Sequence, residues 1–426
     1  MNPVVWKIVS GVLLLCVLVQ QYGAQTSFVR LRAAAPSKQE SHKEAHRTAT
    51  SWTFDPARDR DNHGLTTKQC DAAFPELYHQ IEFSLDHWKG TKIKSDNIKL
   101  LGGNDGGVRF LIHDQQLRII ETRGLHREDF RHRIIAVAQQ ILRAITAAEA
   151  ANEPLPDIEF TVIVDDKPYL HKDPSAALWS FAKQQANKIH DSIWLIPDFH
   201  FFGAPPEAEN FHLMQTRARQ HDAPLEDKIP KVVWRGVEWT NQNLRKPLLE
   251  VTAGKPWADV EAMKWKDPNS VISMDEFCKY RYVVNTEGRS WSARLTHLLN
   301  CDSLVLGHDV EWVAHYYHLF DTLNNCVRVE RDWSDLESTI AYYDENLDEA
   351  QKIANRTKEM FRDRYTTPAA TACYWRKLMR AWSTVAFEPK VIDETKKGTI
   401  RLRGISFEEF IVHDNTRDYP YRAKAG

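Results

Sequence analysis

The chain has 426 residues, which is too long for one ordinary domain and suits two domains with a tail or anchor. Hydrophobic residues make up 42% and charged residues 27%, the balance of a folded globular chain, so full disorder and a polytopic membrane protein are excluded. The net charge of -2 gives no reason to expect nucleic acid as a partner. Aromatic residues are numerous (14 Trp, 13 Tyr and 18 Phe), which fits a large core better than a sugar-stacking surface.

The apolar run from Ile8 to Val19 is the one segment that could enter a bilayer, although it is shorter than the roughly 20 residues that span one. A cleaved signal peptide has this length, but Tyr22 makes the cleavage site poor, so an uncut signal-anchor fits better. We therefore predict a signal-anchor or signal peptide over 1–24 and a polar, solvated stem over 25–65. Both interpretations send the rest of the chain into the secretory pathway.

The cysteines and one sequon bear on the covalent modifications that a secretory lumen permits. Cys16 lies in the apolar run, and the five others, an odd number, allow at most two intrachain disulfides and one free thiol. No C-x-x-C pair occurs, which argues against a structural zinc site. Asn355-Arg-Thr is a glycosylation sequon.

The hydrophobic pattern predicts an alternation of strands and helices. In the first half we expect helices over 71–89 and 128–152, paired strands over 108–114 and 116–121, and buried strands over 157–166, 192–197 and 231–236. In the second half we expect helices over 274–279, 292–299, 334–346 and 347–364, and strands over 280–285, 301–307 and 327–330.

Such an alternation is typical of parallel α/β sheets. We predict an α/β fold of two Rossmann-like domains, over 66–230 and 231–390, that face a cleft, followed by a C-terminal tail over 391–426. In open α/β sheets, ligands bind beyond the carboxyl ends of the strands, so the residues that follow each strand are the first to consider.

Asp165 and Asp166 end one buried strand, just before Lys167 and Pro168. A strand that delivers carboxylates into a turn can build a general base. By position alone, an Asx turn before proline or a solvated loop tip explains the pair better. Adjacent strand residues point in opposite directions, so the two carboxylates make a poor metal-chelating pair.

The segment 285–295 connects a strand to a helix and could hold a phosphate. Gly288 allows a tight turn, and Ser290 and Ser292 offer hydroxyls at the start of the helix, where free N–H groups attract anions. Arg289 and Arg294 could neutralise a diphosphate through forked hydrogen bonds. The segment is neither a Walker loop nor G-x-G-x-x-G, and an ordinary helix N-cap with nearby arginines is the alternative.

Two further arginines follow another strand. Arg235 ends the strand over 231–236, and Arg245 comes a few residues later. The aromatic residues around Phe199 fit a packed turn better than a sugar platform. The chain has no G-x-S-x-G motif and no arrangement that suggests a Ser-His-Asp triad.

Together these segments resemble glycosyltransferase family 90, the capsule-associated (CAP10) and protein O-glucosyltransferase group. The resemblance covers roughly 70–387, and its landmarks occur in the family's order: Asp166-x-Pro, His190-Asp191, Lys279-Tyr280, Asn285, Gly288, Ser292-x-Arg294, Cys301-x-Ser303, Asp332-x-Ser-Asp335 and Cys373-Tyr374. The resemblance implies a GT-B fold with a UDP-sugar in the cleft as substrate, no metal and no cofactor.

The resemblance also implies roles for individual residues. Asp166 would be the general base of an inverting transfer to a hydroxyl of a glycan or glycoprotein. Arg235, Arg245 and the segment from Gly288 to Arg294, with Ser290 and Ser292, would bind the donor, and Asp198 and Phe199 would form a pocket wall. The resemblance further suggests disulfides Cys278–Cys301 and Cys70–Cys373, with Cys326 free.

Some residues depart from the family pattern. Phe-His-Phe-Phe over 199–202 replaces the family's more usual small residue and tryptophan, and Val237 stands where the animal enzymes carry a donor-contacting serine. The final residues are no ER-retention tetrapeptide, so with the predicted anchor we expect a single-pass type II protein of the Golgi or ER membrane, of the fungal type, that transfers xylose or glucose. The alternative is a non-catalytic lumenal module that binds carbohydrate or protein on the same fold.

Overall fold

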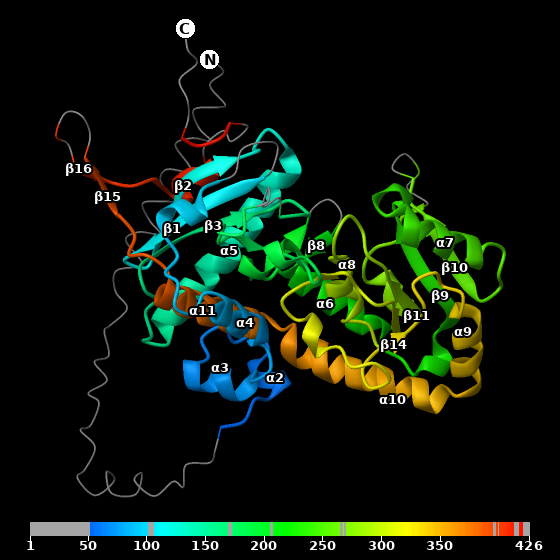
Figure 1. The fold of residues 1–426 in the computed structure, drawn as a ribbon. Coiled ribbons are helices and arrows are strands. Elements are labelled where there is room, and N and C mark those ends of the chain that lie inside the picture. The colour runs from blue at the N-terminus through cyan, green and yellow to red at the C-terminus, as the bar shows by residue number, and fades with distance from the viewer. Residues whose placement is uncertain are drawn as a thin grey trace, which may run out of the picture. The chain divides into compact units, whose positions relative to one another are not determined.

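The computed structural model describes residues 52–100, 106–168, 173–204, 208–264, 267, 270–394, 398, 400–412 and 417–420. The described residues from Thr53 onward form one compact unit (Figure 1). The predicted anchor over 1–24 and most of the predicted stem lie outside the described residues. Among the residues that are described, no helix is both long enough and apolar enough to cross a membrane.

Residues 53–65, which composition assigned to the stem, are part of this unit. The ring of Phe54 lies 5.1 Å from that of Phe74, and the short helix α2 (Pro56–Asp59) is capped by Asp55. Leu65 is buried, and its carbonyl accepts a hydrogen bond of 2.5 Å from Nη1 of Arg376. The polar composition of the segment did not predict this packing, because a few well-spaced apolar side chains are enough to attach it to the folded unit.

The first sheet has six strands in the order β17-β2-β1-β3-β4-β6. The pairs β17–β2, β2–β1 and β1–β3 are antiparallel, whereas the pairs β3–β4 and β4–β6 are parallel. Their bounds are β1 (Gly107–His113), β2 (Gln116–Arg123), β3 (Ile158–Ile163), β4 (Trp179–Ser180), β6 (Trp194–Leu195) and β17 (Ile405–Ser406). The sheet is therefore mixed, not wholly parallel as the alternation predicted. Asp114 and Gln115, both at positive φ, form the two-residue turn of the predicted hairpin.

Two long helices pack against each other beside this sheet: α5 (Glu128–Ala150) and α11 (Pro368–Val385) (Figure 1). Trp179 of β4 stacks on Phe160 of β3 with ring centroids 3.9 Å apart, and it meets Trp382 of α11 edge-on at 5.4 Å. Helix α11 thus completes the core of the first sheet although it lies far from it in sequence. The predicted domain boundary at 230/231 stays a prediction.

The second sheet has five strands in the order β10-β9-β11-β12-β14, and every pair is parallel. Its buried residues include Trp234, Leu248 and Trp333, which join the sheet to its helices. The elements are β9 (Ile229–Gly236), β10 (Ala258–Ala262), β11 (Tyr280–Asn285), β12 (Leu304–Gly307), β14 (Val327–Arg328), α7 (Gln242–Thr252), α9 (Leu336–Glu345) and α10 (Leu347–Thr357). The predicted α/β class is confirmed.

The remaining elements are short. The helices are α3 (Thr67–Ala73), α4 (His79–His87), α6 (Phe211–Ala218), α8 (Arg294–Leu298) and α12 (Phe407–Val412). The strands are β5 (Lys183–Gln184), β7 (Gly203–Ala204), β8 (Ala208–Asn210), β13 (Trp312–Val313), β15 (Ile392–Glu394) and β16 (Ile400–Leu402).

Two predicted helices differ in detail. The helix expected over 71–89 is split into α3 and α4, because Pro75 has no N–H to continue the helix and disfavours helical geometry at Phe74. The helix expected over 347–364 changes after Thr357 into a π-helical segment, Lys358–Tyr365.

The two predicted disulfides are confirmed. Cys70–Cys373 joins α3 to α11, and Cys278–Cys301 joins the residues just before β11 and β12. Cys326 is a free thiol, as expected. Both bonds lie outside the cavity described below, so their effect is on the scaffold.

Candidate active site

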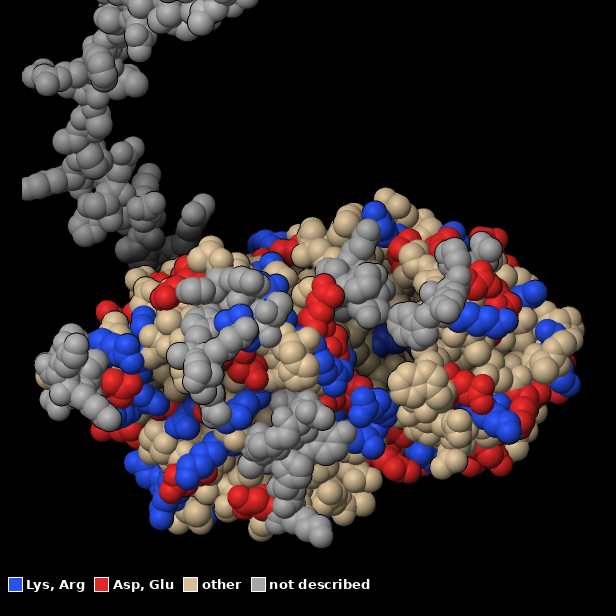
Figure 2. All heavy atoms as spheres, turned by 90° about the horizontal axis from the view of Figure 1, so that it is seen from above, with Lys and Arg blue, Asp and Glu red and all other residues tan. Residues whose placement is uncertain are grey.

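Residues that follow strands of both sheets line one cavity of about 420 Å³. Asp166 follows β3, Phe199 follows β6, Arg235 ends β9, and Arg289 follows β11. A space-filling view shows a hollow with atoms of Lys or Arg inside it (Figure 2). The carboxyl ends of the strands thus converge as the fold class predicts.

Most of the residues singled out from the sequence meet in this cavity. Its lining includes Asp166, Phe199, Arg235, Arg245, Gly288, Arg289, Ser292 and Arg294. Two others do not line it. Ser290 is buried and donates through Oγ to the backbone oxygen of Asp166, 2.5 Å away, so it ties the two halves of the site together. Asp198 is buried and caps the turn after it by accepting from the N–H of His200.

Asp166 is the one acidic residue among those that line the cavity. Its Oδ1 lies 2.9 Å from Nη1 of Arg133, and its Oδ2 lies 4.0 Å from Nη1 of Arg289. Its side chain keeps 28% of its surface exposed. One carboxylate oxygen is therefore held by Arg133 in a hydrogen bond, and the other makes only a long ion pair with Arg289.

Asp165 has a different environment from its neighbour. Its side chain is buried, and its Oδ1 accepts the N–H of Asp166 at 2.6 Å. Burial raises the pKa of Asp165 above its usual value. The two carboxylates have separate surroundings, as strand geometry predicts, and only Asp166 lines the cavity.

Arg245 is a buried cation fixed by backbone carbonyls. Its Nε donates to the oxygen of Glu287 at 3.0 Å, and its Nη1 donates to the oxygen of Val237 at 2.7 Å. Burial and the nearby charge of Arg294 lower its pKa to about 9. A Cβ on Gly288 would come within 3.1 Å of Nη2 of Arg245, so the guanidinium packs closely on a glycine.

Arg294 starts α8 and lines the same part of the cavity. Its Nε and Nη1 are buried and have no hydrogen-bond partner among the described residues. The guanidinium carbon lies 5.8 Å from the ring of Trp234 and 5.9 Å from that of Phe277. Burial lowers the pKa of Arg294 to about 10. A buried guanidinium whose N–H groups lack acceptors is suited to bind an anion that enters the cavity.

Arg235 differs because its charge is compensated within the protein. Its Nη2 lies 2.5 Å from Oδ1 of Asp259, and its Nη1 donates to the backbone oxygens of Asp259 and Trp234 at 2.7 and 3.0 Å. The hydroxyl of Tyr280 donates to the other carboxylate oxygen of Asp259. Arg235 therefore lines the cavity as an ion-paired side chain whose charge is already compensated.

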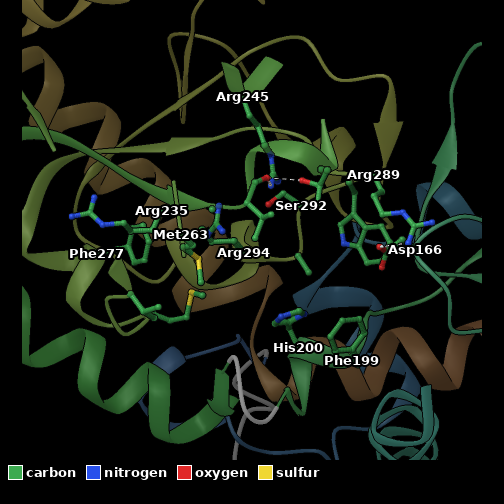
Figure 3. A pocket seen from close by; sticks show the side chains of 18 of the residues that line it. Asp166, Phe199, His200, Arg235, Arg245, Met263, Phe277, Arg289, Ser292 and Arg294 are labelled. Carbon is green, nitrogen blue, oxygen red and sulfur yellow. Dashed lines mark hydrogen bonds and ion pairs between the residues drawn. The ribbon is translucent and has the colours of Figure 1, made fainter. Parts of the chain in front are cut away.

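The cavity has two chemically distinct ends (Figure 3). Met263 and Phe277 lie at one end, Asp166 and Arg289 lie at the other, and Arg245, Ser292 and Arg294 lie between them. Met274, Val271 and Ile272 add to the apolar part of the lining. The order is thus apolar slot, cationic middle and carboxylate end.

Sequence reasoning missed several lining residues, among them Arg133, His200, Met263 and Phe277. Arg133 lies in the first turns of α5 and reaches Asp166 across the site, and its guanidinium lies 4.6 Å over the ring of Phe199. The rule that places ligands at strand ends cannot find a residue on a helix. Met263 and Phe277 look like ordinary core residues in the sequence.

Two remaining predictions lie away from the cavity. Asn355 is half-buried on α10, where its Oδ1 accepts from Gln351 at 2.9 Å, and the sequon hydroxyl of Thr357 is buried and donates to the backbone. Glycosylation of Asn355 stays a prediction. In the part of the chain that the structure describes, no three His, Cys, Asp or Glu side chains gather to hold a metal ion. The expectation that no metal is required also stays a prediction.

Comparison with known proteins places the chain in a family. Protein O-glucosyltransferase 1 of Rattus norvegicus is 27% identical over 54% of this chain and 63% of its own length, so the match spans less than two thirds of that relative. Protein O-glucosyltransferase 2 of Danio rerio is 26% identical over 75% of this chain and 64% of its own length. The solved structure of Anabaena Alr3699/HepE in complex with UDP-glucose matches with a TM-score of 0.31, at 10% identity over 57% of this chain and 76% of that chain. The family model "Glycosyl transferase family 90" matches residues 67–402, most of the chain, and the chain therefore belongs to this family.

Proposed function

We propose that the chain is an inverting, metal-independent glycosyltransferase that moves a sugar from a UDP-sugar to a hydroxyl group of a glycan or protein. Membership of the family supports the reaction class. The order of groups along the cavity supports the orientation of the donor: the nucleoside against Met263 and Phe277, the diphosphate at the arginines, and the sugar near Asp166.

One observation carries the proposal, namely the two cations in the middle of the cavity. Arg133 and Arg235 are each paired with a carboxylate, whereas Arg245 is bound by neutral carbonyls and two atoms of Arg294 have no partner among the described residues. Two uncompensated positive charges match the two negative charges of a sugar-linked diphosphate. They also stabilise the further charge that develops as UDP leaves, which is the task that a divalent cation performs elsewhere.

Asp166 is proposed as the general base. Arg133 holds Oδ1, so Oδ2 is the oxygen that accepts the proton of the acceptor hydroxyl. The deprotonated oxygen forms its bond to the anomeric carbon as the bond from that carbon to the diphosphate breaks, and the electron pair leaves with UDP. Attack from the side opposite the leaving group inverts the anomeric configuration. Arg133 is a positioning residue in this scheme.

We further propose a GT-B arrangement, with the two sheets as donor and acceptor halves. The relatives are named as protein O-glucosyltransferases, which supports glucose as the sugar and a protein as one class of acceptor. Xylose is the other candidate sugar. We also keep the proposal of a lumenal protein attached to the Golgi or ER membrane through its first residues.

The test is UDP release by the purified protein with UDP-glucose, UDP-xylose and other UDP-sugars, with and without EDTA. We expect one sugar to support turnover that EDTA does not change and that Asp166→Asn abolishes. UDP should raise the melting temperature of wild type and Asp166→Asn equally. A melting temperature that UDP leaves unchanged in both proteins would contradict the donor site and favour a non-catalytic binding module.

A further inference from the structure

The described residues beside the mouth of the cavity carry one exposed tryptophan. Trp239 keeps 64% of its surface exposed, whereas the other tryptophans of the described part are buried or half-buried. It lies in the short turn Glu238–Thr240, between Val237 and Thr240 in the sequence, and these two residues line the cavity. A large aromatic face directed to water at the edge of a site is a common mark of a binding surface.

The turn that carries Trp239 is held firmly. Oγ1 of Thr240 donates to the backbone oxygen of Val237 at 2.9 Å, and Nη1 of Arg245 donates to that same oxygen at 2.7 Å. Nδ2 of Asn241 donates to the backbone oxygen of Gly288 at 3.1 Å. The turn is thus fixed to the cationic middle of the cavity. Because its backbone is already held in place, a ligand that binds the ring of Trp239 loses little affinity to the entropy of ordering the turn.

The neighbours of Trp239 supply hydrogen-bonding groups that are free. The side chains of Glu238, Gln242 and Asn243 make no hydrogen bond within the described residues, and Gln242 and Asn243 are exposed. One carboxylate and two amides thus stand within five residues of an exposed ring. A sugar ring has an apolar face of C–H groups and an edge of hydroxyls, and such a surface matches both.

We propose that Trp239 and its polar neighbours form a subsite for a sugar ring of an oligosaccharide acceptor, outside the position where the new bond forms. The inference rests on the proposed function and deepens it, because it assigns a glycan as the acceptor class. The ring of Trp239 stacks on the C–H face of one sugar unit, and the amides and the carboxylate bind its hydroxyls.

The test uses the full chain saturated with UDP and an array of neutral oligosaccharides of one to six sugar units. The proposal predicts that wild type retains oligosaccharides but not single sugars. Trp239→Ala should weaken the strongest of these interactions about ten-fold, as removal of an aromatic anchor does, and Trp239→Phe should restore most of it. Tyr342→Ala, which removes an exposed ring on α9, is the matched control and should change nothing.

Two measurements made without any acceptor separate this subsite from the donor site: the shift of the melting temperature by UDP, and the slow release of UDP from the UDP-sugar into water. Both should be the same in wild type and Trp239→Ala. If wild type retains no oligosaccharide, or if Trp239→Ala binds as wild type does, the subsite is refuted while the donor site stands. If UDP causes no shift in wild type, the proposed function itself fails.

Discussion

Replacing Arg294 by Met should change stability and donor binding in opposite directions. In the free protein the guanidinium is a poorly compensated charge, because burial lowers its pKa to about 10 and two of its nitrogen atoms have no partner among the described residues. A shift of this size corresponds to about 3 kcal/mol against the charged form. The folded pKa lies below the unfolded one, but both lie well above 7, so this cost is constant near neutral pH.

Methionine keeps an apolar side chain of similar length beside Trp234 and Phe277 without the charge. We therefore expect the melting temperature of Arg294→Met to rise by roughly 2–4 °C. The affinity for UDP should fall about 10- to 150-fold, the effect of losing a charge-assisted hydrogen bond worth about 1.5–3 kcal/mol. Differential scanning fluorimetry and titration calorimetry measure the two quantities.

Arg235→Met is the matched control, since Arg235 lines the same cavity but is paired with Asp259. That variant leaves a carboxylate without its partner and should lose about 1–3 kcal/mol of stability. If Arg294→Met bound UDP as tightly as wild type, or lost stability as Arg235→Met does, then the assignment of Arg294 as a cation held ready for the diphosphate would be refuted.

Three other outcomes follow from the same contacts. Arg133→Gln should lower kcat about ten-fold and leave the affinity for UDP unchanged, because it removes the guanidinium that holds Oδ1 of Asp166. An equal loss of UDP affinity in calorimetry would show a general structural defect instead. The double variant Cys70→Ser, Cys373→Ser should lose about 5–6 kcal/mol in denaturant unfolding, because the bond that it removes closes a loop with a sequence separation of 303. Unchanged stability would contradict this role. Lys183→Met should stabilise the protein most below pH 8 and lose this advantage by about pH 10.5, because burial lowers the pKa of Lys183 to about 8. Below pH 8 the folded chain carries the buried charge, between pH 8 and 10.5 it has released a proton that the unfolded chain still binds, and above 10.5 both states are neutral. Melting curves of both proteins from pH 6 to 10.5 test this, and a constant difference would oppose it.

The sequence predicts the second sheet better than the first. Strands such as β9, β11 and β12 are apolar runs separated by helical patterns, and all of them pair in parallel as that pattern indicates. In the first sheet the hairpin reverses the direction of β1 relative to β3, and β17 comes from residues 405–406, far along the chain. No local pattern reveals such a long-range pairing.

Within the site, residues in recognisable turns were predictable and residues on helices were not. Asp166 follows the end of a strand and Arg294 begins a helix, and side chains at both kinds of position commonly contact ligands. Arg133 is one of many charged residues on α5, and its role depends on the crossing of that helix over the loop after β3. Ser290 and Asp198 were expected at the ligand but are buried in hydrogen bonds that support the site, because solvent access is not encoded in spacing.

A crystal structure of the Asp166→Asn variant with the UDP-sugar that supports turnover tests the central claim most directly. The account predicts the diphosphate within hydrogen-bond distance of Arg245 and Arg294, the uracil beside Met263 and Phe277, and the anomeric carbon directed toward residue 166. No density for a cation between the phosphates and the protein is expected in crystals grown with magnesium. A diphosphate bound through a metal ion, or a nucleotide seated outside this cavity, would contradict it.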